Sequence, residues 1–211
     1  MSYSPALLAS LITASQETIT ANADAVTALD QAIGDGDHVI NLQRGLDALM
    51  LQREELSQLP DWTTAWQKIG MTIMSTVGGA SGSLLGTLFV SMSKAARGQT
   101  LNQQTFAAIF SAGVEAVKQR GKSDAGEKTM LDVLIPVAAY LQQAATDGVS
   151  LPDVLQHVSE VAITGMESTR DMIATRGRAS FLEERTRGHI DAGARTNQLI
   201  ICAIVSVLAT A

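Results

Sequence analysis

STVGGASGSLLGTLFVSMSKAARG, residues 75–98, contains one complete helix between two glycine stops. The pair Gly78-Gly79 ends the preceding helical pattern, and Ser81 offers a hydroxyl that can cap the free backbone N–H groups of the next helix. Apolar residues then recur at helical spacing up to Gly98, where a helix readily ends. The stretch therefore predicts helix, turn and helix, without the alternation of a strand.

The same pattern continues on both sides of this stretch. A capping residue or a proline precedes an apolar series of helical period, and a glycine or proline follows it. Eight helices are expected on this basis, at about residues 5–30, 38–59, 61–77, 81–97, 102–120, 128–146, 151–175 and 193–211. No linker or repeat divides the chain. The sequence thus predicts a single all-α domain over residues 1–211, a bundle or barrel of about eight antiparallel helices.

The composition argues against several classes of protein. Hydrophobic residues make up 46% of the 211 residues and aromatic residues only 4%, which predicts an aliphatic core. A net charge of −6 without a basic run argues against nucleic acids and anionic membranes as partners. The single cysteine, Cys202, lies in an apolar stretch and is predicted to be a buried, inert thiol. Neither a signal peptide nor an apolar run of about 20 residues is visible, so a soluble cytoplasmic protein is expected.

Four connections between the expected helices are rich in glycine and charge. They are the first, third, fifth and seventh connections, IGDGDHVIN, GGASGS, RGKSDAGEKTM and RGRASFLEERTRGHIDAG. Alternate connections of an up-and-down bundle lie at the same end. We therefore expect these four segments to gather at one rim.

The first of these segments suggests a metal site. Asp30, Asp35 and Asp37 fall within eight positions, and no lysine or arginine precedes Arg44. Carboxylates suit Mg²⁺, which proteins often share with substrate phosphates. The alternative is an ordinary Asp-Gly turn at the surface. The third aspartate and the lack of a nearby counterion favour the metal site, while the spacing does not fit an EF-hand.

The other segments suggest phosphate binding. Glycines just before a helix N-terminus leave N–H groups free for an anion, and arginine forks match phosphate oxygens. The last connection carries four arginines, Arg176, Arg178, Arg185 and Arg187. Each feature also has a plainer interpretation, as a helix–turn–helix connection or a solvated loop. RGKS imitates the end of a P-loop but lacks its first glycine and its strand.

Individual side chains in these segments add to the picture. His38 and His189 are candidates for ligand contact, whereas His157 is expected at the surface of a helix. Met130, at a loop–helix junction, could pack against a flat base. Together the four segments suggest a Mg-nucleotide site.

Four motifs carry a resemblance to a known family. LDQAIGDGDH, MTIMSTVGGASG, RGKSDAGEKTMLDV and RGRASFLEERTRGHIDAGA stand in the order and at the spacing found in the nucleotide-binding L subunit of dihydroxyacetone kinase. The chain resembles this family over nearly its whole length. The resemblance implies a barrel of eight antiparallel helices with ADP or ATP at one end.

The resemblance also implies roles for particular residues. Two Mg²⁺ ions would be held by Asp30, Asp35 and Asp37, and Arg178 would be the catalytic residue. The implied nucleotide contacts are His38, Val39, Ile40, Asn41, Gly79, Ala80, Gly121, Met130, Arg178, Asp191, Ala192 and Gly193.

The implied partners follow from the division of labour in this family. A separate K subunit holds the sugar on a histidine, and the L subunit supplies the phosphoryl donor. Stand-alone L subunits often belong to the glycerol-metabolism kinases fed by the phosphotransferase system. In these, bound ADP is rephosphorylated by an M subunit. A homodimer is left open.

Four positions depart from the family pattern. Val39 and Glu183 stand where the family has glycine, and Ser83 and Ala192 stand where it has proline. Two other functions accommodate these departures. One is an ATP-dependent kinase subunit for another small keto-sugar, and the other is a regulatory module whose nucleotide state a transcription factor would read.

Overall fold

The computed structural model describes residues 4–211, which form nine α-helices and three short 3-10 helices without any strand. The all-α fold class is therefore confirmed. The helices are α1 (Leu8–Ala21), α2 (Ala23–Ile33), α3 (His38–Ser57), α4 (Trp62–Thr76), α5 (Gly79–Ala95), α6 (Gln103–Gly121), α7 (Leu131–Asp147), α8 (Leu151–Ser168) and α9 (Ala192–Leu208), with η1 (Pro5–Leu7), η2 (Thr169–Asp171) and η3 (Arg178–Thr186). Among the described residues, no helix combines the length and apolarity that crossing a membrane requires.

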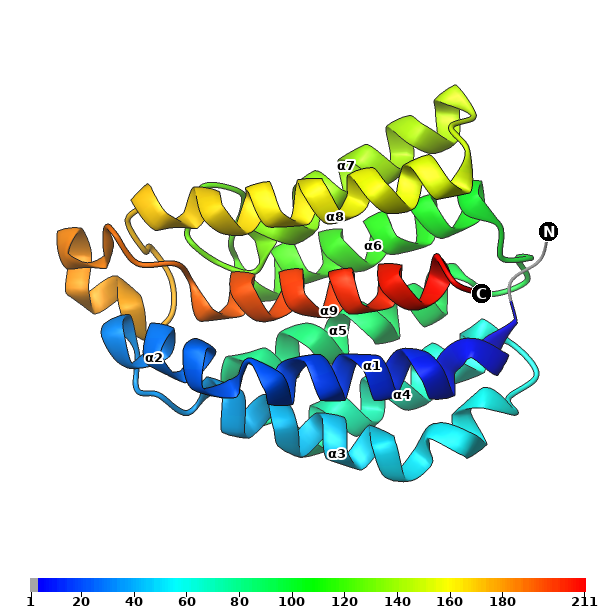
Figure 1. Ribbon diagram of the computed structural model, residues 1–211, viewed down its shortest axis with the longest axis horizontal. Helices are drawn as coiled ribbons and strands as arrows, with labels where there is room; N and C mark the ends of the chain where they lie inside the picture. The colour runs from blue at the N-terminus through cyan, green and yellow to red at the C-terminus, as the bar shows by residue number, and fades with distance from the viewer. Residues whose placement is uncertain (1–3) are drawn as a thin grey trace.

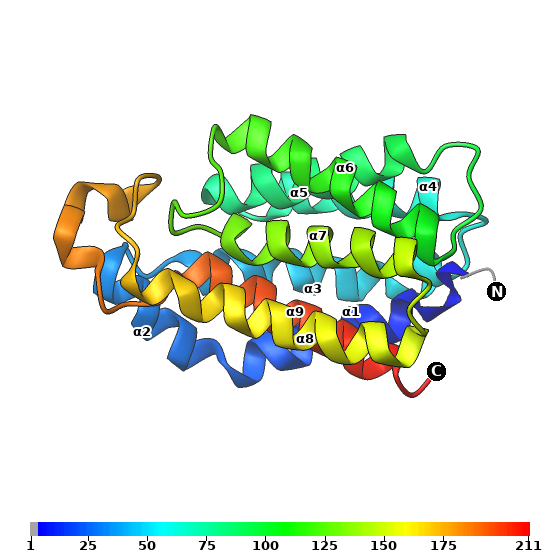
Figure 2. The ribbon, with the colours of Figure 1, turned by 90° about the horizontal axis from the view of Figure 1, so that it is seen from above.

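Eight of the α-helices close into a ring. Each helix from α3 to α9 packs against the next one along the chain, and α1 completes the ring by packing against both α3 and α9. The long helices lie side by side along the longest axis of the molecule (Figures 1 and 2). The barrel of eight antiparallel helices is confirmed, while α2 stands outside the ring and contacts α3, α9 and η3.

The interior of the ring is aliphatic, as the composition predicts. The most deeply buried apolar side chains are those of Ile19, Val26, Leu56, Ile109, Leu131, Leu134, Val117, Val133 and Val137. Each such side chain stabilises the fold by about 1.5–3 kcal/mol relative to leaving it exposed. The interior of the barrel is thus a packed aliphatic core.

The predicted first helix is wrong in one respect, because it is two helices. The chain breaks at Asn22, whose side-chain amide donates a hydrogen bond to the Thr18 carbonyl oxygen at 2.9 Å. Asparagine competes in this way for the backbone groups of a helix. The break turns α2 away from α1, so that α2 reaches the end of the barrel where Asp30 lies (Figure 1).

Other differences are at helix ends. The predicted seventh helix ends at Ser168 rather than near 175, and the seventh connection folds in part as η3. The predicted sixth helix begins at Leu131 rather than at Lys128. Cys202 is half-buried rather than buried, because α9 faces the ring with only part of its surface. Its sulfur accepts a hydrogen bond from the Gln198 amide at 3.2 Å.

The four charged connections lie at one end of the barrel, together with α2 and η3 (Figures 1 and 2). We call this end the rim, and define it as residues 30–41, 76–81, 121–132 and 169–193. The sequence-based prediction that these segments gather is confirmed. The packing of the helices that lead into these connections fixes where the rim residues lie.

The helices α7 and α8 approach each other closely near the rim. Pro136 has no N–H to offer the Asp132 carbonyl oxygen one turn earlier in α7. Gly165 of α8 packs onto that same oxygen, and a methyl group on Gly165 would lie 2.3 Å from it. Only glycine therefore allows this spacing.

Gly165→Ala is expected to lower the free energy of unfolding by about 1–3 kcal/mol, because the two helices must separate to admit the methyl group. Thermal unfolding followed by circular dichroism measures the change. Thr164→Ala, one residue away and exposed, is the control and should change stability by less than about 0.5 kcal/mol. Equal stability of the two variants would contradict this packing argument.

Candidate functional site

Three carboxylates converge at the junction of α2 and α3. Oxygen atoms of Asp30, Asp35 and Asp37 all lie within 4.8 Å of one another. Asp30 belongs to the last turn of α2 and accepts a hydrogen bond from the His38 backbone N–H at 3.1 Å. Gly36 adopts a φ of +76° between the other two aspartates, a conformation that favours glycine. The turn therefore brings together the three residues predicted from sequence.

The counterion missing from the local sequence comes from the far end of the chain. Nη1 of Arg178, the first residue of η3, lies 2.6 Å from Oδ2 of Asp35. The arginine side chain is 71% exposed, so this ion pair contributes little to stability. An exposed guanidinium beside a carboxylate cluster is well placed to turn toward a phosphate instead.

The cluster fits a magnesium site. All three groups are hard oxygen donors, and only one of them is paired with an arginine in the described structure. The negatively charged carboxylates lie close together, and each repels the others unless a cation lies between them. The donor set thus matches the metal that the sequence suggests.

His38 connects this cluster to two other helices. Its Nε2 lies 2.9 Å from Thr196 Oγ1 of α9, and its Nδ1 lies 3.2 Å from Ser81 Oγ of α5. The Thr196 hydroxyl donates to the Gly193 carbonyl oxygen, so it accepts from Nε2–H, and the Ser81 hydroxyl then donates to Nδ1. Burial lowers the pKa of His38, opposed only in part by Asp30 and Asp37, so the ring is neutral near pH 7.

The start of α5 faces the same rim. Its first residue, Gly79, has a φ of +68°, and both Gly79 and Ala80 are exposed. Gly78 packs against Asn41, since a methyl group there would lie 2.5 Å from Asn41 Oδ1. The free N–H groups of this N-terminus and the helix dipole suit an anion beside the carboxylates.

The neighbouring residues of α3 differ in exposure. Val39 is buried in the core, whereas Ile40 is 58% exposed. Val39 therefore fills core space, and Ile40 lies on the outer face of the rim.

The start of α9 forms the other side of the rim. Asp191 caps α9 by accepting a hydrogen bond from the Ala194 N–H at 2.7 Å. Burial raises the pKa of Asp191 to about 6. Gly193 packs against Met130, whose backbone nitrogen would lie 3.8 Å from a methyl group on Gly193. Ala192 and Met130 are buried, and Gly121 ends α6.

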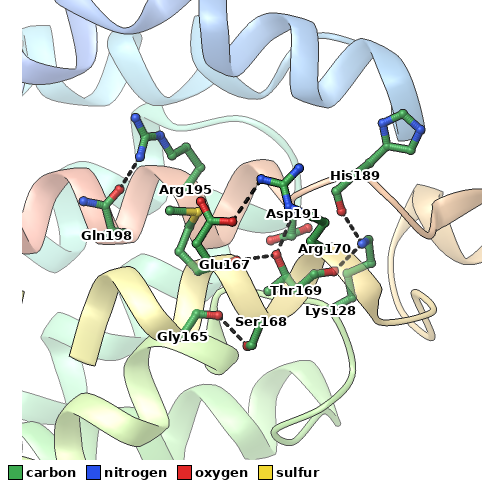
Figure 3. Close-up of polar contacts among 11 residues, drawn as sticks. Lys128, Gly165, Glu167, Ser168, Thr169, Arg170, His189, Asp191, Arg195 and Gln198 are labelled. Carbon is green, nitrogen blue, oxygen red and sulfur yellow. Dashed lines mark hydrogen bonds and ion pairs between the residues drawn. The ribbon is translucent and has the colours of Figure 1, made fainter. Parts of the chain in front are cut away.

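The structure adds residues that sequence reasoning missed, above all Lys128. This lysine is only 2% exposed, has a φ of +60°, and donates hydrogen bonds to the carbonyl oxygens of Thr169 and His189 (Figure 3). His189 thus enters the network through its backbone, and its ring points away from Lys128 (Figure 3). His157 lies exposed on α8, as predicted.

Backbone strain marks the connection that carries Arg178. Glu183 has φ 49° and ψ −125°, a combination that suits glycine. Buried Thr186 maintains it by donating to the Glu183 carbonyl oxygen at 2.7 Å and accepting from the Ala174 N–H at 3.0 Å. The departure from the family glycine therefore has an energetic cost at this position.

Glu183→Gly is expected to raise the free energy of unfolding by about 1 kcal/mol, because glycine adopts this conformation without strain. Thermal unfolding measures the change, about 2–4 °C for a chain of this size. Glu184→Gly is the matched control and should lower stability, since Glu184 pairs with Arg187 at 2.9 Å and does not have a positive φ. If Glu183→Gly and Glu184→Gly both lowered stability, the inferred backbone strain at Glu183 would be wrong.

A closed helical barrel with converging carboxylates, a free helix N-terminus and an arginine at one rim defines a class of proteins that bind metal-nucleotides. The chain belongs to the DAK2 domain family, whose model matches residues 32–206. The resemblance drawn from the four sequence motifs is thereby confirmed.

Individual relatives agree with the family assignment. The chain is 43% identical to the ADP-binding subunit DhaL of PEP-dependent dihydroxyacetone kinase 1 from Listeria innocua, covering 90% of this chain and 89% of that protein. It is 38% identical to the ADP-binding subunit DhaL of a PTS-dependent dihydroxyacetone kinase from Lactococcus lactis, covering 92% of each. The fold matches the dihydroxyacetone kinase of C. freundii, solved with AMP-PNP and Mg²⁺, with a TM-score of 0.74 and 23% identity over 98% of this chain and 34% of that one.

Proposed function

We propose that this chain is the ADP-binding subunit of a dihydroxyacetone kinase that depends on the phosphotransferase system. The observation that carries the proposal is the convergence of Asp30, Asp35 and Asp37 beside Arg178 at the rim. Kinase subunits to which the chain is similar are named for the same activity. We assign the subunit to the cytoplasm, where a phosphocarrier would recharge its nucleotide.

The proposed site uses the rim as follows. The three aspartates would hold two Mg²⁺ ions, which when bound neutralise charge on the phosphates. Backbone N–H groups of Gly79 and Ala80 would donate to phosphate oxygens. The nucleotide would contact His38, Val39, Ile40, Asn41, Gly79, Ala80, Gly121, Met130, Arg178, Asp191, Ala192 and Gly193.

Phosphoryl transfer depends mainly on position and on neutralising charge. Arg178 would leave Asp35 and offset the charge that develops on the transferring group. The one histidine ring that adjoins the carboxylates, His38, is held at both nitrogens by Ser81 and Thr196. The rim is therefore suited to a phosphoryl donor, and the base that activates the sugar would come from the K subunit.

The isolated chain is expected to bind Mg-ADP but to phosphorylate no free dihydroxyacetone. The assay combines purified chain, Mg-ATP and dihydroxyacetone, with and without a K subunit of the same system. A further arm supplies an M subunit with its phosphoryl donor in place of ATP. Activity should require the K subunit and should be highest with the M subunit. Robust turnover by the chain alone would overturn the subunit assignment.

A further inference from the structure

Lys128 is a buried charge that the proposed chemistry does not use. It lies on the connection between α6 and α7, among charged residues that are mostly exposed, yet its side chain is 2% exposed. A lysine ammonium is expensive to bury unless its donors are satisfied. The energetic cost of burying this ammonium indicates that Lys128 has a structural or functional role.

The ammonium is satisfied by two carbonyl oxygens from distant parts of the chain. Thr169, at the carboxyl end of α8, supplies one, and His189, just before α9, supplies the other (Figure 3). A cation at a helix carboxyl end is also favoured by the helix dipole. Lys128 therefore adds a side-chain link between its own connection, the carboxyl end of α8 and the start of α9. Backbone hydrogen bonds from Gly188 to Arg170 and from Thr175 to Glu127 also hold these segments together.

Three carboxylates act on the ammonium. Burial has the largest effect and lowers the pKa of Lys128, and the nearby carboxylates of Asp191, Asp171 and Asp132 offset this shift only in part. Two of these carboxylates already accept backbone hydrogen bonds: Asp132 from the Gly126 and Thr129 N–H groups, and Asp191 from its own helix N-terminus. The lysine thus lies near one carboxylate that binds the loop before α7 and another that caps α9.

Two of these three segments carry proposed nucleotide contacts. Met130 follows Lys128 by two residues, and Asp191–Gly193 follow His189 by two. A methyl group on Gly193 would lie 3.8 Å from Met130, so the two residues are neighbours at the rim. The Asp191 backbone N–H donates to Thr169 Oγ1 at 3.1 Å, so Thr169 holds both the lysine and the start of α9.

We propose that Lys128 is a positioning residue for the nucleotide, whose ammonium fixes Met130 relative to Asp191–Gly193. The inference rests on the proposed nucleotide-binding function. Among the described residues, the hydrogen bonds of Lys128 go to Thr169 and His189 and not to the carboxylate cluster, so we expect it to act mainly on the nucleotide side of the rim. This separation gives the test.

Lys128→Met keeps the length of the side chain and removes the donors. Mg-ADP affinity, measured by calorimetry well below the melting temperature, should fall at least tenfold. Mn²⁺ binding to the aspartates without nucleotide, measured by paramagnetic resonance, should stay within twofold. The matched control is Lys94→Met, an exposed lysine in the last turn of α5, which should change neither affinity.

Chemical rescue separates positioning from general loss of structure. Lys128→Cys in a Cys202→Ala background, alkylated with bromoethylamine while unfolded and then refolded, restores an ammonium at nearly the same place. Mg-ADP affinity should recover with it, and alkylation with iodoacetamide should not restore it.

Several outcomes would overturn the inference. One is unchanged Mg-ADP affinity in Lys128→Met, and another is equal loss of Mn²⁺ and Mg-ADP affinity. If Lys128→Met fails to fold, the two alkylated proteins decide the question, and equal affinities would count against the proposal. Failure of the unmodified chain to bind Mg-ADP would instead contradict the proposed function itself.

Discussion

Asp35→Ala is expected to abolish Mg-ADP binding while leaving the helical content unchanged. Asp35 supplies one of the three carboxylates that converge among the described residues, so its loss removes a ligand and a negative charge from the proposed pair of Mg²⁺ ions. Its loss costs the fold little, because its ion pair with Arg178 is exposed. Calorimetry with Mg-ADP and circular dichroism measure the two effects.

Thermal unfolding measures Mg-ADP binding to the unmodified chain and to Asp35→Ala independently of calorimetry. At 100 times its Kd, a ligand that binds only the folded state stabilises it by about 2.7 kcal/mol, or roughly 5–10 °C here. The unmodified chain should show this shift with Mg-ADP and a much smaller one with ADP and EDTA. Asp35→Ala should show neither, while the exposed control Asp24→Ala on α2 should behave like the unmodified chain. An Asp35→Ala protein with normal ADP affinity would refute the metal assignment.

Arg178→Ala is expected to slow phosphoryl transfer about 10²–10³-fold while weakening nucleotide binding far less. In the described structure the guanidinium is exposed and bound to Asp35, so little ground-state binding energy depends on it. We expect Arg178 to stabilise the transition state, in which charge develops on the transferring group. The assay uses the chain with its K subunit and compares kcat with Mg-ADP affinity.

Two further variants make this test specific. Arg176→Ala removes an arginine from the same connection, one that pairs with Glu127 at 3.3 Å, and should retain most of the rate. Arg178→Lys keeps the charge but loses the planar fork, and should fall between the unmodified chain and Arg178→Ala. Equal losses of affinity and rate in Arg178→Ala would assign the arginine to binding rather than to the transition state.

The fold was largely predictable because its signals are local. Caps, glycine stops and helical spacing each act within a few residues, and the ends of α4 and α6 agree closely with the prediction. The break at Asn22 was missed because an asparagine side chain turned back onto Thr18 leaves no mark on the apolar pattern. The parity of the connections then predicted the rim without any knowledge of distances.

The carboxylate cluster was also predictable, since Asp30, Asp35 and Asp37 are neighbours in sequence as well as in space. The remainder depends on long-range contacts. The partner of Asp35 is Arg178, and the acceptors for Lys128 are backbone carbonyl oxygens, which carry no residue signature. A lysine within a charged loop is normally exposed, so its sequence context gave no sign of burial.

The order of helices around the barrel has a consequence for folding kinetics. All neighbours in the ring are consecutive or nearly so along the chain, except α1 and α9, which must meet across almost its full length. Local pairings form quickly, and joining distant ends costs loop-closure entropy. The contacts of His38 with Thr196 and of Asp35 with Arg178 likewise join early and late parts of the chain. We therefore expect the rim to be completed in the last step of folding, so that Mg-nucleotide slows unfolding without accelerating refolding.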